Sequence, residues 1–237
     1  VLLSEDLNAV TDGTAVVATQ DANSYDAAGQ LDFGTTYYWR VDEANNATGW
    51  DEGSIWSFTT EAYSYPITNV TAAASAETPT SPAMRAVDGS GLNEFDEHGV
   101  DLKTMWGTSG GLPAWIQFTF DREYMLDKLW VWNGNSEIES LMGFGAKTVA
   151  VEYSLDGETW TALENVPEFA QGTGQTTYVT NTTVEFGGIT AKYVKLTIND
   201  DWGVTTMVSL SEVRFFYVPV QARNPQPADG AADVSVD

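Results

Sequence analysis

A short strand–turn–strand segment constrains this chain more than any other part of its sequence. Residues 149–154 alternate apolar and polar side chains, which is the period of a strand that buries one face. Asp156-Gly157 follows, and glycine supplies the positive φ angle that a tight hairpin turn needs. Thr159 and Trp160 then begin a second extended segment. The segment therefore predicts a β-hairpin.

Short, evenly spaced strands of the same kind recur through the middle of the chain. Turns rich in Gly, Asn or Asp separate them, and the only helical signal is about one turn at residues 82–86. This pattern is typical of a two-layer jelly-roll sandwich. The segments predicted as strands are residues 67–72, 115–120, 126–133, 147–154, 160–163, 176–185, 192–198 and 210–218.

Five motifs surround the hairpin in a fixed order. They are Ala86-Val87-Asp88-Gly89, Thr104-Met105-Trp106, an apolar strand ending in Asp121, Tyr153-Ser154-Leu155-Asp156-Gly157-Glu158-Thr159-Trp160, and Ser211-Glu212-Val213-Arg214. On these motifs, residues from about 65 to 218 resemble the discoidin, or coagulation-factor type C, domain. They are most similar to its bacterial sugar-binding branch, the family 32 carbohydrate-binding modules. The resemblance implies an all-β fold with a discoidin-like jelly-roll β-sandwich over residues 63–218.

The flanking residues resemble a different kind of domain. Residues 36–43 and 54–60 are two aromatic-rich alternating segments, similar to the closing hairpin of a fibronectin type III-like sandwich. Only later strands of such a domain can be placed, so we expect residues 1–61 to form its C-terminal part, a partial sandwich. Residues 219–237 contain a Pro-rich linker and resemble the start of the next repeat. The chain is therefore interpreted as a piece of a tandem array.

A partial sandwich has an unpaired edge and an uncovered apolar face. The last residues of the chain resemble the strand that residues 1–61 lack. This predicts main-chain hydrogen bonds between residues 228–236 and a strand within residues 1–60, as in donor-strand pairing. A tail that projects freely from the molecule is the alternative.

The charge of the chain excludes several classes of partner. There are 34 acidic and 10 basic residues, a net charge of 10 − 34 = −24. Such a field repels nucleic acid and anionic lipid surfaces. There is no Cys, which excludes disulfides and thiolate metal sites. No apolar run reaches membrane-spanning length, so we expect neither nucleic-acid binding nor membrane insertion.

An acidic loop is the candidate metal site. Residues 88–101 carry five carboxylates, but their spacing is not that of an EF-hand, so spacing alone favours a solvated loop. The resemblance implies a structural Ca²⁺ held by Asp88, Thr104, Glu212 and main-chain carbonyls. Fourteen residues separate Gly89 from Thr104, more than is usual in the family, which leaves the carbonyl ligands open. A salt bridge or a turn cap is the alternative role for the two acids.

Aromatic and amide side chains in predicted loops are the candidate sugar contacts. Trp132, Asn133 and Asn135 combine a ring with two amides at a strand end, the chemistry that stacks on sugar CH groups and bonds to hydroxyls. Trp202 lies in the loop before the last strand, where modules of the resembled family often place a stacking ring. His98, the single His, is either solvent-exposed or a sugar contact, and its acidic neighbours favour its charged form.

The sequence contains no catalytic constellation. The acids are scattered or crowded in one loop, and there is no nucleophile motif, Gly-rich phosphate loop or second His. We therefore expect a non-catalytic module that binds a polysaccharide or glycan. We expect it within a larger extracellular or cell-surface bacterial protein, beside neighbouring domains and whatever catalytic domain that protein carries. The alternative is an adhesion or protein-interaction module without sugar specificity.

Overall fold

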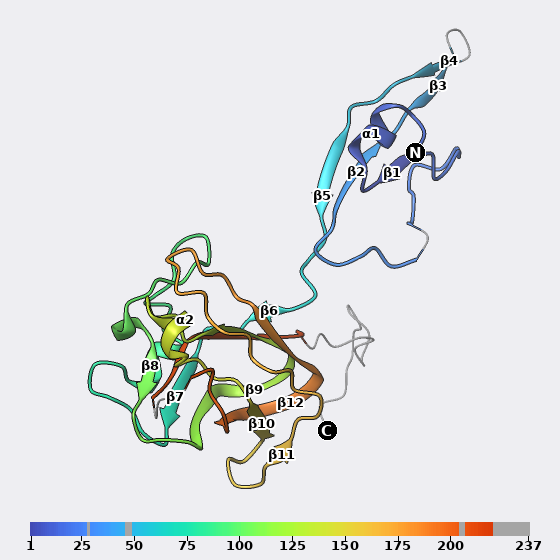
Figure 1. The fold of residues 1–237 in the computed structure, drawn as a ribbon. Helices are drawn as coiled ribbons and strands as arrows, with labels where there is room; N and C mark the ends of the chain where they lie inside the picture. The colour runs from blue at the N-terminus through green and yellow to red at the C-terminus, as the bar shows by residue number, and fades with distance from the viewer. Residues whose placement is uncertain (28, 46–48, 204–206, 220–237) are drawn as a thin grey trace, which may run out of the picture. The chain divides into compact units, whose positions relative to one another are not determined.

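The computed structural model describes residues 1–27, 29–45, 49–203 and 207–219 (Figure 1). The chain divides into two units, Val1–Tyr63 and Ser64–Asp237. Their described elements are mostly strands. The helical segments are short: α1 (Leu7–Thr11), α2 (Glu139–Met142) and the 3₁₀ turns η1 (Ala83–Ala86) and η2 (Leu102–Thr104). In these residues no helix is both long and apolar enough to cross a membrane.

The first unit is built on one antiparallel sheet in the order β1 (Leu2–Ser4), β2 (Thr36–Arg40), β5 (Trp56–Thr59). The hairpin of β3 (Glu43–Asn45) and β4 (Gly49–Asp51) extends from it. Helix α1 was not predicted. It begins where the Asp6 carboxylate accepts a hydrogen bond from the backbone of Asn8, and it buries Val10 completely.

The fibronectin type III-like assignment of this unit stays a prediction, because its described residues form one three-stranded sheet and the two-stranded β3–β4 hairpin, not a seven-stranded sandwich. Trp56 and Phe58 on the edge strand β5 are 61% and 41% exposed. The predicted pairing of residues 228–236 with a strand of this unit falls outside the described residues.

Two long antiparallel strands organise the second unit. β9 (Ala114–Asn133) pairs with β12 (Thr182–Ile198) from one end to the other. The remaining strands add to this pair. They are β7 (Val70–Ala74) on the first half of β9, β13 (Val208–Tyr217) on its second half, β6 (Tyr65–Pro66) and β8 (Trp106–Thr108) on β13, and β10 (Val149–Ser154) followed by β11 (Thr161–Ala162) on β12.

The long strands bend, so each contributes to two layers. The register of the pair shifts around Gly187 and Gly188, which have positive φ angles of 62° and 85°. Phe118 and Phe120, in the first half of β9, contact Phe215 of β13 with ring centroids 5.2 and 5.0 Å apart. Because β13 pairs with the second half of β9, the two halves face each other across one core. The predicted β-sandwich is confirmed.

The strand boundaries differ from the prediction at these bends. Segments 115–120 and 126–133 are parts of one strand, β9, and segment 192–198 is continuous with residues 182–185 in β12. The hairpin turn formed as predicted: the Asp156 carboxylate accepts hydrogen bonds from the backbone of Glu158 and Thr159. These bonds lower the pKa of Asp156 to about 2.

Deleting the Phe215 ring should destabilise the second unit strongly, because the side chain is fully buried between the two layers. We expect Phe215→Ala to lower the free energy of unfolding by about 3–5 kcal/mol. Phe95→Ala removes the same atoms from a ring that is 71% exposed and should change it by no more than about 0.5 kcal/mol. Chemical denaturation measures both. Equal effects would contradict the assigned core.

Candidate functional site

Loops from distant parts of the chain meet at the end of the sandwich where β9 finishes at Asn133. β12 and β13 begin there, since Thr182 pairs with Val131 and Leu210 pairs with Asn133. The predicted residues His98, Asn133, Asn135 and Trp202 are linked to these loops by hydrogen bonds. They lie at one end of the unit. Their accessibility differs from the prediction.

Asn133 is fully buried and all of its amide capacity is used inside the protein. Its Nδ2 donates to the carbonyls of Ala146 and Ala170 at 2.7 and 2.8 Å. Its Oδ1 accepts from the backbone N–H of Gly134 and Ala146 at 2.9 and 2.8 Å. No donor or acceptor is left for a sugar, so its assignment as a ligand contact is wrong.

The side chain of Asn135 likewise forms hydrogen bonds with the backbone, in other loops. It is fully buried, and its Nδ2 donates to the carbonyls of His98, Gly99 and Gln175 at 2.9–3.3 Å. Its Oδ1 accepts from the backbone of Gly174 at 2.7 Å. Its assignment as a sugar contact is also wrong. The physical reason is that buried loops without a strand ladder need side-chain partners for their backbone groups.

His98 and Trp132 are likewise buried completely. His98 Nδ1 lies 2.9 Å from the carbonyl of Gly99, and a Cβ on Gly91 would approach its Nε2 to 2.0 Å. Burial lowers the pKa of His98, which reverses the expectation that neighbouring acids favour its charged form. Trp132 donates its indole N–H to the carbonyl of Asp96 at 3.0 Å. Neither ring is accessible to a ligand, so both assignments are corrected.

Trp202 is the one predicted sugar contact that remains partly exposed. Its indole N–H donates to the carbonyl of Phe169 at 2.9 Å. The ammonium of Lys147 lies 4.7 Å from the ring centroid. One face of the ring is therefore occupied by a cation and its polar edge is engaged, so the stacking role of Trp202 stays a prediction.

The structure brings together two of the predicted calcium ligands. Glu212 Oε2 accepts a hydrogen bond from the backbone N–H of Gly89 at 3.1 Å, which places the turn of Asp88 beside Glu212. Asp88 also caps its own turn through Ser90 and forms an ion pair of 2.9 Å with Arg85. Both alternative roles considered for Asp88, a turn cap and a salt bridge, are therefore present.

Thr104 ends η2, where its hydroxyl donates to the carbonyl of Asp101. In the described part of the chain, no group of three or more His, Cys, Asp or Glu side chains is arranged to hold a metal. A cation at Asp88 and Glu212 would therefore have two carboxylates and otherwise neutral oxygens.

The electrostatics of Glu212 fit a cation. The side chain is 4% exposed. Its pKa is raised to about 8, mainly by burial; the Gly89 N–H and Arg214 act in the opposite direction, and the like charge of Asp88 adds to the effect of burial. A buried carboxyl beside a second carboxylate is stabilised in its ionised form by a bound cation. The pair is chemically suited to Ca²⁺, which prefers oxygen ligands.

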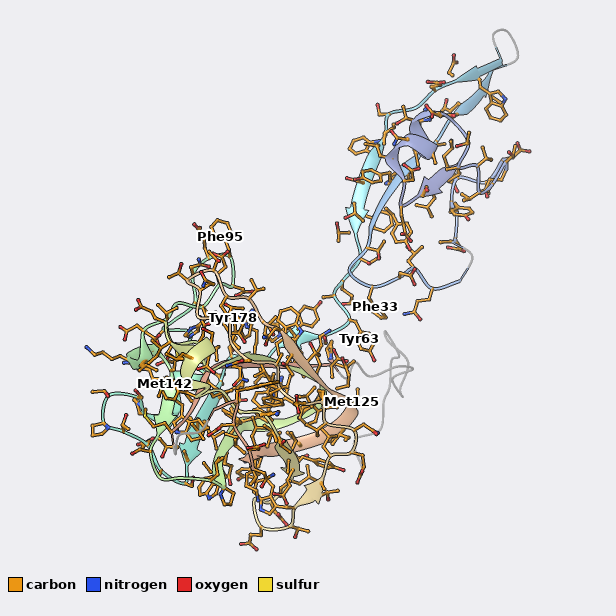
Figure 2. The ribbon with its side chains drawn as sticks, in the orientation of Figure 1. Phe33, Tyr63, Phe95, Met125, Met142 and Tyr178 are labelled. Atoms are coloured by element: carbon orange, nitrogen blue, oxygen red, sulfur yellow. The ribbon has the colours of Figure 1, made fainter. Side chains whose placement is uncertain are left out.

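The acidic loop presents an exposed ring that was not among the predicted sugar contacts. Figure 2 shows Phe95 at a loop tip, projecting away from the second unit. Asn93 Oδ1 accepts from the backbone of Phe95 and Glu97 at 2.9 and 3.0 Å. Asp96, which has a positive φ of 57°, makes a two-point ion pair with Arg214 at 2.7 and 2.8 Å. The loop is therefore fixed on both sides of the exposed ring.

The sequence contained a weak signal for this loop. Asn93 and Glu97 flank the single aromatic of the acidic segment, and Asn favours a turn in which its side chain bonds to the backbone two residues on. The partner that completes the scaffold, Arg214, is 118 residues from Asp96. Spacing along the chain does not reveal that pair.

Comparisons with known proteins give a family and several similar structures. The family model of the F5/8 type C domain matches residues 69–213. No curated protein matches the chain. Similar solved structures include the family 32 carbohydrate-binding module of Clostridium perfringens NanJ in complex with galactose, with 19% identity over 65% of this chain and 98% of that chain and a TM-score of 0.46.

Two further modules are similar to the same extent. One is CpGH89CBM32-5 from Clostridium perfringens in complex with GalNAc-β-1,3-galactose, with 19% identity, 64% and 99% coverage and a TM-score of 0.46. The other is the family 32 module of AlyQ in complex with 4,5-unsaturated mannuronic acid, with 19% identity, 64% and 98% coverage and a TM-score of 0.46. The modules are non-catalytic.

Replacing Asn133 by Ala should destabilise the second unit, because backbone groups of three loop residues lose their partner in a buried place. We expect a loss of at least about 3 kcal/mol in the free energy of unfolding. Asn199→Ala, a matched change at an exposed Asn with one long bond of 3.3 Å, should cost no more than about 0.5 kcal/mol. Denaturant titration compares the two, and a stable Asn133→Ala protein would contradict the structural role.

Proposed function

Because the chain belongs to the F5/8 type C domain family, which matches more than half of its length, we propose that its second unit is a non-catalytic carbohydrate-binding module. The observation that carries the proposal is Phe95, a ring that is 71% exposed on a loop fixed by Asn93 and by the Asp96–Arg214 pair. We place the module outside the cell or on its surface, within a larger bacterial protein.

Covering this exposed ring with a ligand is favourable, since burying a Phe side chain contributes about 1.5–3 kcal/mol. The carboxylate of Glu94 is exposed beside Phe95 and accepts hydrogen bonds. A ring that contacts CH groups and a carboxylate that accepts hydroxyl hydrogens together suit a sugar. This arrangement favours a neutral or basic sugar, because the acidic residues of the loop repel anions. Of the modules named above, two hold neutral sugars and one holds an unsaturated uronic acid.

The same proposal includes a structural Ca²⁺ at Asp88 and Glu212. Bound there, the ion would join the turn of the acidic loop to β13 and neutralise two neighbouring carboxylates. Thr104 and main-chain carbonyls are the proposed remaining ligands. The ion supplies no chemistry to a ligand in this scheme; it fixes the base of the loop that carries Phe95.

A second candidate function, adhesion to a protein, is favoured by apolar side chains on neighbouring loops. Leu141 and Ile138, in and next to α2, are 81% and 49% exposed, and Val179 is 52% exposed. Asn135 joins the loops of these residues to Gly99 through its hydrogen bonds. A protein surface with an apolar patch, rather than a glycan, would cover such side chains.

Phe95→Ala should abolish or greatly weaken glycan binding while the protein stays folded. We expect an affinity loss of at least tenfold, because a lost stacking contact is worth about 1.4 kcal/mol or more. A glycan array identifies a ligand for the full chain, and calorimetry then measures the variant. Trp115→Ala, which removes another ring (38% exposed) from a sheet strand, is the matched control and should bind normally.

Two other variants separate the alternatives. If Trp202→Ala loses binding and Phe95→Ala does not, the ring of the site is Trp202 and the assignment to Phe95 is wrong. If the full chain binds no glycan but binds cells, and Leu141→Ser removes that binding, the module is an adhesion domain.

Calcium should raise the Tm of the second unit, and more at high pH than at low pH. The pKa of Glu212 is raised from 4.5 to about 8. Without metal, its contribution to stability is therefore fully present below about pH 4.5 and is lost as the pH rises through about 8. Ca²⁺ binds the ionised carboxylate and displaces the proton, so its effect on Tm should grow from pH 5 to pH 8.

Thermal unfolding in CaCl₂ or EDTA measures this dependence. Glu212→Gln should abolish the calcium effect and weaken the pH dependence of the metal-free protein. Glu185→Gln, at an exposed carboxylate of β12, should leave both unchanged. A calcium effect that persists in Glu212→Gln places the ion elsewhere.

A further inference from the structure

The first unit contains a cleft between its sheet and a loop. The cleft has a volume of about 350 Å³. Its floor is the sheet face that carries Leu3, Trp39 and Phe58, and Leu3 and Trp39 are direct partners in the pairing of β1 and β2. Its wall is the loop of residues 20–27. The volume lies at the lower end of the range of about 300–1,000 Å³ that is typical of small-molecule sites.

The loop that forms the wall is held in place. Its base is joined to the first residue of the unit, because the backbone of Val17 donates to the carbonyl of Val1 at 3.1 Å. Further along, the Gln20 side-chain amide donates to the carbonyls of Ala22 and Ser24 at 3.2 and 2.5 Å. The cleft is therefore bounded by a sheet on one side and by a hydrogen-bonded loop on the other.

None of the side chains in the lining is charged, although the chain carries 34 acidic residues, and the one charged group, the ammonium of Val1, donates to the carbonyl of Ala18 at 2.9 Å. Asp21 and Asp26 belong to the same loop, but they are exposed and do not line the cleft. Asn23 and Tyr25, which lie between them, do line it. The loop thus presents neutral polar and aromatic groups to the cleft, an arrangement that suits an uncharged ligand because such a ligand is not repelled by unpaired charge.

We propose that this cleft is a second carbohydrate-binding site, which takes one or two neutral sugar rings. Tyr25, Trp39 and Phe58 provide aromatic and apolar surface for sugar CH groups, and the amide of Asn23 bonds to hydroxyls. A peptide that adds a strand binds instead to an open strand edge through main-chain hydrogen bonds. The cleft lies on a sheet face under a loop, where side chains provide the contacts.

This site goes beyond the function proposed for the second unit, since it shares the ligand class but uses none of the same residues. The test uses the full chain with Phe95→Ala, so that the site at Phe95 does not contribute. The probes are the neutral disaccharides lactose, cellobiose and maltose, with galacturonic acid as the charged comparison. Calorimetry and saturation-transfer NMR measure binding.

We expect at least one neutral disaccharide to bind the Phe95→Ala chain and galacturonic acid to bind at least tenfold more weakly. Adding Tyr25→Ala or Asn23→Ala should weaken the neutral sugar at least tenfold. Asn23 is exposed, so its variant reports on the site even where Tyr25→Ala disturbs the loop. Asp26→Asn, in the same loop but outside the lining, is the matched control and should stay within twofold.

The outcomes are distinct for the two sites. Binding by the Phe95→Ala chain that is lost when Tyr25→Ala or Asn23→Ala is added supports the cleft, whatever Phe95→Ala does to the ligand found on the glycan array. Binding lost with Phe95→Ala alone, or unchanged by both cleft variants, overturns the cleft proposal. Capture of an apolar peptide by the cleft without any sugar binding overturns it as well.

Discussion

The loops at one end of the second unit depend on polar side chains that replace missing backbone partners. Strands satisfy their N–H and C=O groups through a ladder, but buried loops have none. Asn133 and Asn135 supply those bonds for segments on both sides of the loop bundle. Glu139 does the same: it is fully buried and accepts from the backbone of Phe144 and Gly145, and burial raises its pKa. The end of the sandwich is thus a polar network closed to solvent.

Because this network is closed to solvent, a ligand can contact only groups on the outer surface of the loops. The amides of Asn133 and Asn135 already have partners within the protein. The ligand must therefore be bound by other groups, which the network holds in position. The loop of Phe95 is such a group, because Trp132 donates to the carbonyl of Asp96 and Arg214 pairs with its carboxylate. Because the backbone next to Phe95 is already fixed, the loop loses little conformational freedom when a ligand binds, which favours affinity. The buried residues therefore serve recognition indirectly, by fixing the loop.

The fold was predictable where its signals are local. The alternation of residues 149–154 and the Asp156-Gly157 turn predicted the hairpin, because period and turn chemistry act over a few residues. The family resemblance predicted that Asp88 and Glu212 approach each other, which spacing alone does not show.

Burial was not predictable. An amide that bonds to sugar hydroxyls also bonds to a buried backbone, and the partners of Asn133 lie 13 and 37 residues away. Whether residues 115–133 form two strands or one bent strand likewise depends on the packing around Phe215.

The distribution of basic side chains narrows the class of ligand further. Of the nine basic residues in the described part of the chain, eight are already engaged locally. Arg40, Arg85, Lys128, Lys195 and Arg214 form ion pairs, and Arg122, Lys147 and Lys192 lie over aromatic rings. To bind an anionic polysaccharide, the protein would need unpaired basic side chains at the site. The polysaccharide would also be repelled by the net charge of −24. A neutral glycan needs only rings and hydrogen-bonding groups, and both candidate sites supply these. Both candidate sites are therefore proposed to bind neutral sugars, because most basic side chains already have a partner.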